Sequence, residues 1–176
     1  IIKYGLALLL LSFYSCESWL NVTPSDRLSE EMLFNDREGF VKALNGVYIE
    51  LNTNELYGRN LTAGALDVMG QYYSVASSSH AFYNYGGLVY TGNDEKALFD
   101  NMWQKCYAVI ACCNTIIEKC DENKAGLSPV WKGSIKGEAL ALRAMLHFDM
   151  LRLFQPPDLT EEGKTQKRIP YKTDFG

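Results

Sequence analysis

Residues 137–154 read GEALALRAMLHFDMLRLF, a stretch made almost entirely of strong helix formers whose only glycine stands first. Upstream, Ser128 can cap a helix and Pro129 suits its first position. Downstream, Pro156 forbids continuation of the helix beyond Phe154. The pattern therefore predicts one helix of ~27 residues, roughly 40 Å long at a rise of 1.5 Å per residue.

Two apolar faces run along this predicted helix. One face carries Ile135, Ala139, Leu142, Leu146 and Leu153, and the other carries Leu140, Ala144, Phe148 and Leu151. A surface helix needs only one such face. We therefore expect the helix to be sandwiched between other helices, with a partner layer on each side.

A second long helix is predicted from Asp94 to the residues before a short connector at 121–127. Its apolar residues recur at steps of three and four: Leu98, Met102, Cys106, Val109, Cys113, Ile116 and Cys120. With the first helix it forms a long antiparallel hairpin over 94–154. The three cysteines lie seven residues apart, about 10 Å along the axis, too far to bridge. They are interpreted as buried free thiols, whereas Cys112 points elsewhere.

Shorter helices are predicted before this hairpin. Ser29 can cap residues 30–34, and Asn35 with Glu38 resembles a capping box that opens a helix reaching position 51. Gly39 and Gly46 weaken that helix, which indicates close approach by another element. A further helical piece is expected over residues 59–69. The fold class predicted from these patterns is all-α.

Residues 70–93 have a different character, because aromatic side chains alternate with turn residues and no helical period survives. Tyrosine rings beside Asn and Ser suit the faces of sugars and offer hydrogen bonds. Our candidate ligand contacts are Tyr72, Tyr73, Tyr83 and Tyr85. Two alternatives stay open: the rings pack the loop onto the helices or onto a missing C-terminal half, or they form a surface that faces another protein, a transporter under the resemblance described below.

No catalytic or metal-binding constellation stands out. The two histidines, His80 and His147, belong to no nucleophile or metal motif, and we expect no cofactor and no metal. Asn114 is expected to be buried and bonded to the backbone of a neighbouring element. The charged residues Glu138 and Arg143, and Asp149 and Arg152, are expected to serve structure, either as ion pairs with each other or through contacts with neighbouring helices. A net charge of −4 gives no case for nucleic-acid binding.

The N-terminus has the pattern of a bacterial lipoprotein signal. Lys3 precedes an apolar run at 6–11, and the small residue Ser15 stands before Cys16. The run is too short to cross a bilayer, which needs ~20 apolar residues. We expect residues 1–15 to be removed and Cys16 to be acylated as the lipid anchor. A general secretory signal cut elsewhere is the alternative.

Four motifs, taken together, resemble the SusD/RagB family of outer-membrane lipoproteins. The first is the helix 137–154, with Gly-Glu-Ala, then Arg-Ala, then an aromatic end. The second is Trp103, Tyr107, Ile110 and Asn114. The third is Ala43-Leu44-Asn45-Gly46-Val47-Tyr48. The fourth is the acylable cysteine followed by Leu20-Asn21-Val22-Thr23-Pro24. The resemblance runs from Cys16 to about Tyr171.

The resemblance implies an all-α scaffold of tetratricopeptide-like helix pairs with a long aromatic loop. It makes residues 16–176 a SusD-like N-terminal helical domain, incomplete at its C-terminus because family members are longer. It implies a surface-exposed, lipid-anchored protein of the bacterial outer membrane, without enzymatic activity. Such a protein binds glycans or other nutrients and passes them to a SusC-like TonB-dependent transporter. A helical scaffold for protein–protein contacts, or the non-catalytic part of a surface hydrolase, are the alternatives.

Overall fold

The protein is described by a computed structural model that covers residues 30–155, 161–165 and 168–174, without the side chains of 162 and 163. The helices in order are α2 Glu30–Leu33, α3 Arg37–Leu51, the π-helix η2 Leu61–Leu66, α4 Asp67–Met69, α5 Tyr83–Gly86, α6 Asn93–Glu122, α7 Pro129–Phe154 and α8 Glu161–Thr165. No strand occurs within these ranges, which confirms the all-α prediction. The chain divides into two units, Ile1–Met32 and Leu33–Gly176, and the features below belong to the second.

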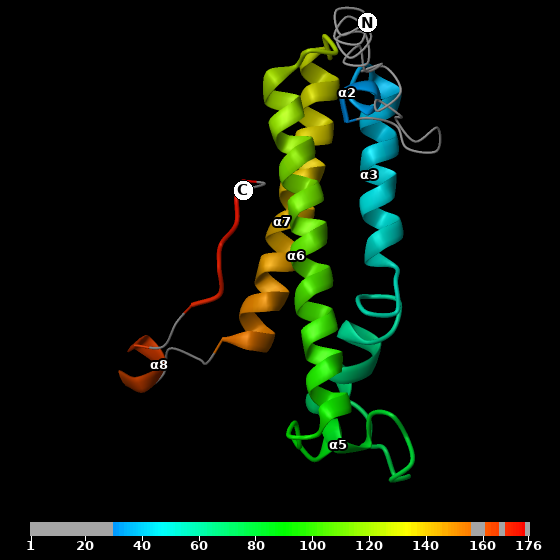
Figure 1. Cartoon of the computed structure of the whole chain (residues 1–176), viewed down its shortest axis with the longest axis vertical. Coiled ribbons are helices and arrows are strands. Elements are labelled where there is room, and N and C mark those ends of the chain that lie inside the picture. The colour runs from blue at the N-terminus through cyan, green and yellow to red at the C-terminus, as the bar shows by residue number, and fades with distance from the viewer. Residues whose placement is uncertain (1–29, 156–160, 166–167, 175–176) are drawn as a thin grey trace, which may run out of the picture. The chain divides into compact units, whose positions relative to one another are not determined.

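The predicted hairpin is the centre of this unit. Helices α6 and α7 run antiparallel, and α3 lies along them (Figure 1). As predicted, Ser128 is the N-cap of α7 and accepts from the backbone N–H of Trp131 at 3.4 Å. Pro129 occupies the first turn of α7, and the helix ends at Phe154. Of the helices in the described residues, none is both long enough and apolar enough to cross a membrane.

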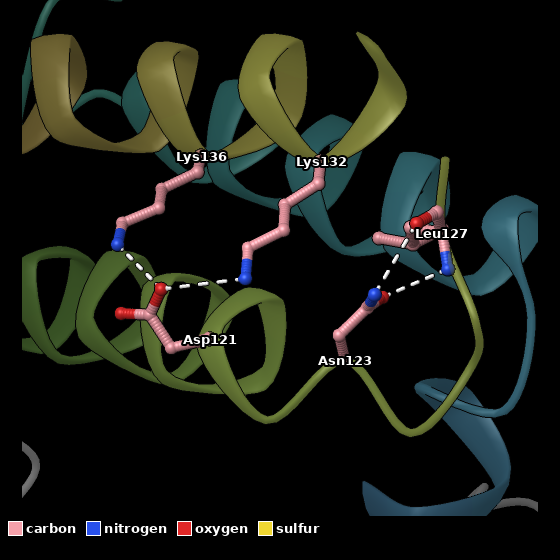
Figure 2. A network of polar contacts seen from close by, with 5 residues as sticks. All are labelled: Asp121, Asn123, Leu127, Lys132 and Lys136. Carbon is pink, nitrogen blue, oxygen red and sulfur yellow. Dashed lines mark hydrogen bonds and ion pairs between the residues drawn. The ribbon is translucent and has the colours of Figure 1, made fainter. Parts of the chain in front are cut away.

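The turn between α6 and α7 is fixed by polar contacts. Asn123 ends α6 in the left-handed conformation, with φ of 49°. Figure 2 shows its side chain reaching Leu127, donating to that carbonyl at 3.2 Å and accepting from that N–H at 2.8 Å. Asp121 on α6 faces two lysines of α7, with Lys136 at 2.5 Å and Lys132 at 3.9 Å (Figure 2). These contacts set the direction in which α7 returns along α6.

The core lies between α3, α6 and α7 and continues under the segment 56–85. Apolar residues from each element fill it, among them Phe40, Leu44 and Val47 of α3, Met102, Val109 and Ile110 of α6, and Ile135, Leu146 and Met150 of α7. The thiols of Cys106, Cys113 and Cys120 are free and buried there, as expected, whereas Cys112 is exposed. Burial raises the pKa of Cys106 and of Cys113 to about 12.

The expectation that α7 is covered on two faces is not met within the described residues. Its first face is buried, apart from a partly buried Leu153. The second face stays open: Leu140, Leu151 and, at 57% exposure, Phe148 are accessible to solvent. The periodicity therefore identified the buried face correctly, whereas the predicted cover over the second face is not found among the described residues.

Two details of the shorter helices differ from the sequence-based expectation. The N-cap of α3 is Asp36 and not Asn35, because the Asp36 carboxylate accepts from the N–H of Gly39 at 2.8 Å. The α-helical piece expected over 59–69 is a π-helix, η2, that continues into the short α4. Close approach is found at Gly39, where a methyl group would lie 1.5 Å from the Leu33 carbonyl oxygen. Among the described residues nothing lies within 4 Å of the same position at Gly46, so the close approach expected there is not found in this part of the chain.

Candidate functional site

The aromatic segment 70–93 presents three of its four candidate tyrosines to solvent. Tyr72 is 84% exposed, and Tyr73 and Tyr83 are each 42% exposed. Tyr85 differs, with 2% exposure. It lies within the one-turn helix α5, which the sequence pattern did not indicate. The accessible aromatic surface of the segment is therefore made by Tyr72, Tyr73 and Tyr83.

The buried Tyr85 side chain packs this segment against the core. Its ring makes edge contacts with Phe82 at 5.9 Å and with Phe99 of α6 at 5.6 Å between centroids. Burial raises the pKa of its phenol to about 12. The side chain thus packs α5 onto the core and does not offer its ring to a ligand. Sequence alone gives no sign that separates this tyrosine from its exposed neighbours.

Side chains of the segment donate hydrogen bonds to backbone carbonyl groups of η2, α4 and α5. The Tyr73 hydroxyl donates to the carbonyl of Ala63 at 2.6 Å. The Gln71 amide donates to the carbonyl of Gly86 at 3.0 Å, which joins the start of the segment to α5. At Gly64 in η2 a methyl group would lie 2.6 Å from the Phe82 ring. The ring can therefore pack against η2 only because Gly64 has no side chain. These hydrogen bonds accordingly fix the backbone that carries the exposed tyrosines.

A second fastening ties the segment to the first turn of α6. Asn84 donates to Oε1 of Glu95 at 2.6 Å, and this hydrogen bond lowers the pKa of the Glu95 carboxyl. Gly92 makes room for the carboxylate, because a methyl group there would lie 1.9 Å from its Oε2 atom. The hydrogen bond from Asn84 to Glu95 thus joins α5 to α6, whereas the bond from Gln71 joins α5 to the start of the segment.

A different group of polar side chains lies on the seam of α6 and α7 and binds the extended segment 169–174, drawn in red in Figure 1. We call these four residues, Tyr107, Asn114, Arg143 and His147, the clasp. The Tyr107 hydroxyl donates to the carbonyl of Pro170 at 2.8 Å. Asn114 is buried and donates to the carbonyl of Asp174 at 2.8 Å, as the sequence led us to expect.

The clasp borders a hollow of about 300 Å³ between α6 and the extended segment. Trp103, Tyr107 and Ile110 of α6 form one wall, and Pro170, Lys172 and Asp174 form the other. The sequence patterns named Trp103, Tyr107 and Asn114 only as a helix motif. The patterns did not indicate which face segment 169–174 contacts, because the hydrogen bonds that hold it there run through its main-chain atoms.

The charged residues of α7 make both kinds of contact that were expected, an ion pair and contacts with neighbouring helices. Asp149 forms the expected ion pair with Arg152 and also accepts from the hydroxyl of Tyr57. Glu138 and Arg143 do not pair: Glu138 accepts from the Tyr48 hydroxyl at 2.6 Å. Arg143 instead donates to Asn114 at 2.7 Å across the helix seam. Arg143 therefore bonds to Asn114 of α6 and not to Glu138 of its own helix.

Both histidines make hydrogen bonds to backbone N–H groups. Nδ1 of His80 accepts from the N–H of Phe82 at 3.1 Å within the aromatic segment, and His147 belongs to the clasp. Over the described ranges, His, Cys, Asp and Glu side chains form no group of three or more that could hold a metal ion. The lipid-anchor candidate Cys16 and the signal 1–15 lie outside the described residues.

The described residues form a helical scaffold with an exposed aromatic surface on segment 70–93. A family model for SusD-like proteins, described as starch-binding and associating with the outer membrane, matches residues 18–174. The chain belongs to this SusD-like family. It is also similar to the SusD-like protein P2 of Formosa agariphila, at 25% identity over 157 residues, which cover 86% of this chain and 29% of that protein. The chain thus spans less than a third of the length of this curated relative. No solved structure matches it.

Proposed function

We propose that the protein is a non-enzymatic glycan-binding lipoprotein of the bacterial cell surface. In this proposal it works with a SusC-like TonB-dependent transporter of the outer membrane in nutrient uptake. Membership of a family described as starch-binding and associated with the outer membrane supports the ligand class and the location. The relative from Formosa agariphila carries the SusD-like name and adds no ligand of its own.

The observation that carries the proposal is the exposure of Tyr72, Tyr73 and Tyr83 on a segment whose backbone is held. Aromatic rings stack on the apolar faces of sugar rings, and a tyrosine adds a hydroxyl for hydrogen bonding. A ring that stands on a fixed backbone loses less conformational freedom when it binds. Our proposed contacts are these three residues, while Tyr85 positions them from the core.

The proposed anchor is Cys16, acylated after removal of residues 1–15. A single acyl chain gives only weak attachment, whereas the several chains of a lipoprotein hold firmly. In cells that express the full-length protein, Cys16→Ser should stop incorporation of labelled fatty acid and release the protein from membranes. Continued incorporation of label into the variant would contradict the anchor assignment.

The binding proposal is tested on full-length protein by affinity electrophoresis through gels that contain starch or other polysaccharides. Each of Tyr72→Ala and Tyr83→Ala should weaken binding of the retained glycan about tenfold, equivalent to 1.4 kcal/mol. Trp131→Ala is the matched control, because this ring is also 42% exposed but lies at the start of α7, where Arg37 stacks on it at 4.7 Å. Equal mobility of all three variants and the wild type in every gel would contradict the proposed contacts.

A further inference from the structure

His147 in the clasp is buried, with 4% exposure, and both of its ring nitrogens have partners. The backbone N–H of Lys172 donates to Nε2 at 3.2 Å, so this nitrogen carries no proton. In a neutral imidazole the proton is then on Nδ1, which lies 2.9 Å from the carbonyl oxygen of Arg143 and donates to it. His147 therefore holds the extended segment in its neutral form and in one tautomer only.

The ring lies between groups from every element packed around it. Tyr107 of α6 makes an edge contact at 6.3 Å, and Tyr171 of the extended segment lies at 4.4 Å between centroids. The charged groups are Arg143, one turn earlier on α7, and Lys172 on the segment. Burial lowers the pKa of His147, and the Arg143 guanidinium adds to this effect, while the hydrogen bond to the Arg143 carbonyl acts in the opposite direction.

We propose that protonation of His147 opens the clasp and releases segment 169–174 from the seam of α6 and α7. A proton on Nε2 would face the N–H of Lys172, so the hydrogen bond would be replaced by a contact between two donors. The imidazolium would also be a second buried cation beside Arg143. The remaining bonds, from Tyr107, Asn114 and Arg143 to main-chain carbonyls, involve groups that do not titrate near neutral pH.

The direction of the pH dependence follows from linkage. The closed clasp lowers the pKa of His147 below its ordinary value of 6.5, whereas the open form exposes the ring and restores that value. Closure is therefore fully favoured above the ordinary value and is lost as the pH falls from there through the lowered value. In that window each pH unit shifts the equilibrium up to about tenfold toward the open form.

Opening has a structural consequence for the hollow beside the clasp. Pro170, Lys172 and Asp174 form one of its walls, and all three leave with the segment. The faces of Trp103 and Tyr107 would then be accessible from the side that the segment covers. Release of the segment would therefore expose the rings of Trp103 and Tyr107 on the face formed by α6 and α7.

The test is hydrogen exchange of full-length protein, measured by mass spectrometry at a series of values from about pH 7.5 to about pH 5 and corrected for intrinsic exchange. Protection of the Lys172 amide, followed in peptides that span residues 171–174, should fall by up to about thirtyfold across this range, while the amides of α6 keep theirs. In His147→Gln, whose side-chain oxygen can accept but does not titrate, protection should not vary with pH.

His80→Gln is the matched control, since His80 also accepts from a backbone N–H, and it should behave as the wild type. Protection of 171–174 that stays constant in the wild type, or falls equally in His147→Gln, would overturn the proposal. Nitrogen-15 shifts of the imidazole give a second measurement without substitution. They should show a proton on Nδ1 and a pKa below 6.5. A proton on Nε2, or a raised pKa, would overturn the proposal as well.

Discussion

Oδ1 of Asn114 on α6 accepts a hydrogen bond from the Arg143 guanidinium of α7 at 2.7 Å. The amide of the same side chain donates to the carbonyl of Asp174 at 2.8 Å. One buried asparagine thus joins two long helices and the extended segment. Both halves of its amide are used, so neither an apolar residue nor an aspartate can replace it without leaving a partner unbonded.

Asn114→Ala should lower the free energy of unfolding by about 2 kcal/mol, because it leaves Arg143 and the carbonyl of residue 174 without their partner. Urea denaturation of the full-length protein measures the change. Thr115→Ala is the control: its hydroxyl bonds only to the Ala111 carbonyl of its own helix, at 3.2 Å, and the loss should stay below about 0.5 kcal/mol. Equal effects of the two substitutions would show that Asn114 is not the joint described here.

The two glycines of α3 should respond in opposite directions. Gly39→Ala places a methyl group against the Leu33 carbonyl oxygen and should cost about 3 kcal/mol or more. Gly46→Ala meets nothing within 4 Å and should stabilise the protein by up to about 1 kcal/mol through helix propensity. Thermal denaturation of the paired variants tests this. A loss on Gly46→Ala would mean that another part of the protein packs against α3 at that position.

The cysteines of α6 should differ sharply toward a thiol reagent. Cys112 is exposed, whereas Cys113 is buried and its pKa is raised to about 12. At about pH 8 only about one Cys113 side chain in ten thousand is a thiolate, even before access is considered. Cys112 should therefore react first, and Cys112→Ser should remove the fast phase. Fast labelling of Cys106, Cys113 or Cys120 in this variant, located by peptide mass spectrometry, would place that thiol at the surface and contradict its burial.

Much of the fold was predictable because its long helices satisfy several independent signals. In α7 the cap at Ser128, the proline at the first turn and the stop before Pro156 agree with the apolar periodicity. In α6 the spacing of Cys106, Cys113 and Cys120 indicated their burial. The π-helix η2 escaped prediction because its apolar pattern fits an ordinary helix equally well. Asn35 and Asp36 are both good caps, and only the geometry of the turn selects between them.

The candidate site was less accessible to sequence reasoning. The composition of segment 70–93 indicated a surface of aromatic and turn residues, and Tyr72, Tyr73 and Tyr83 are exposed. Tyr85 could not be told apart, since its burial depends on contacts with Phe82 and Phe99 that come from the tertiary fold. The sequence could not predict that the four clasp residues lie together, for a similar reason. Its residues come from two helices, and they bind main-chain atoms, which leave no trace in the sequence.

We propose that the protein binds a glycan and does not cleave it. Isothermal titration calorimetry of full-length protein with starch-derived oligosaccharides tests both parts, provided that reducing ends are assayed in the same samples after long incubation. We expect saturable heat of binding, weakened in Tyr72→Ala, and no new reducing ends. New reducing ends would make the protein a hydrolase, and the absence of binding to these and to other glycans would contradict the proposed function.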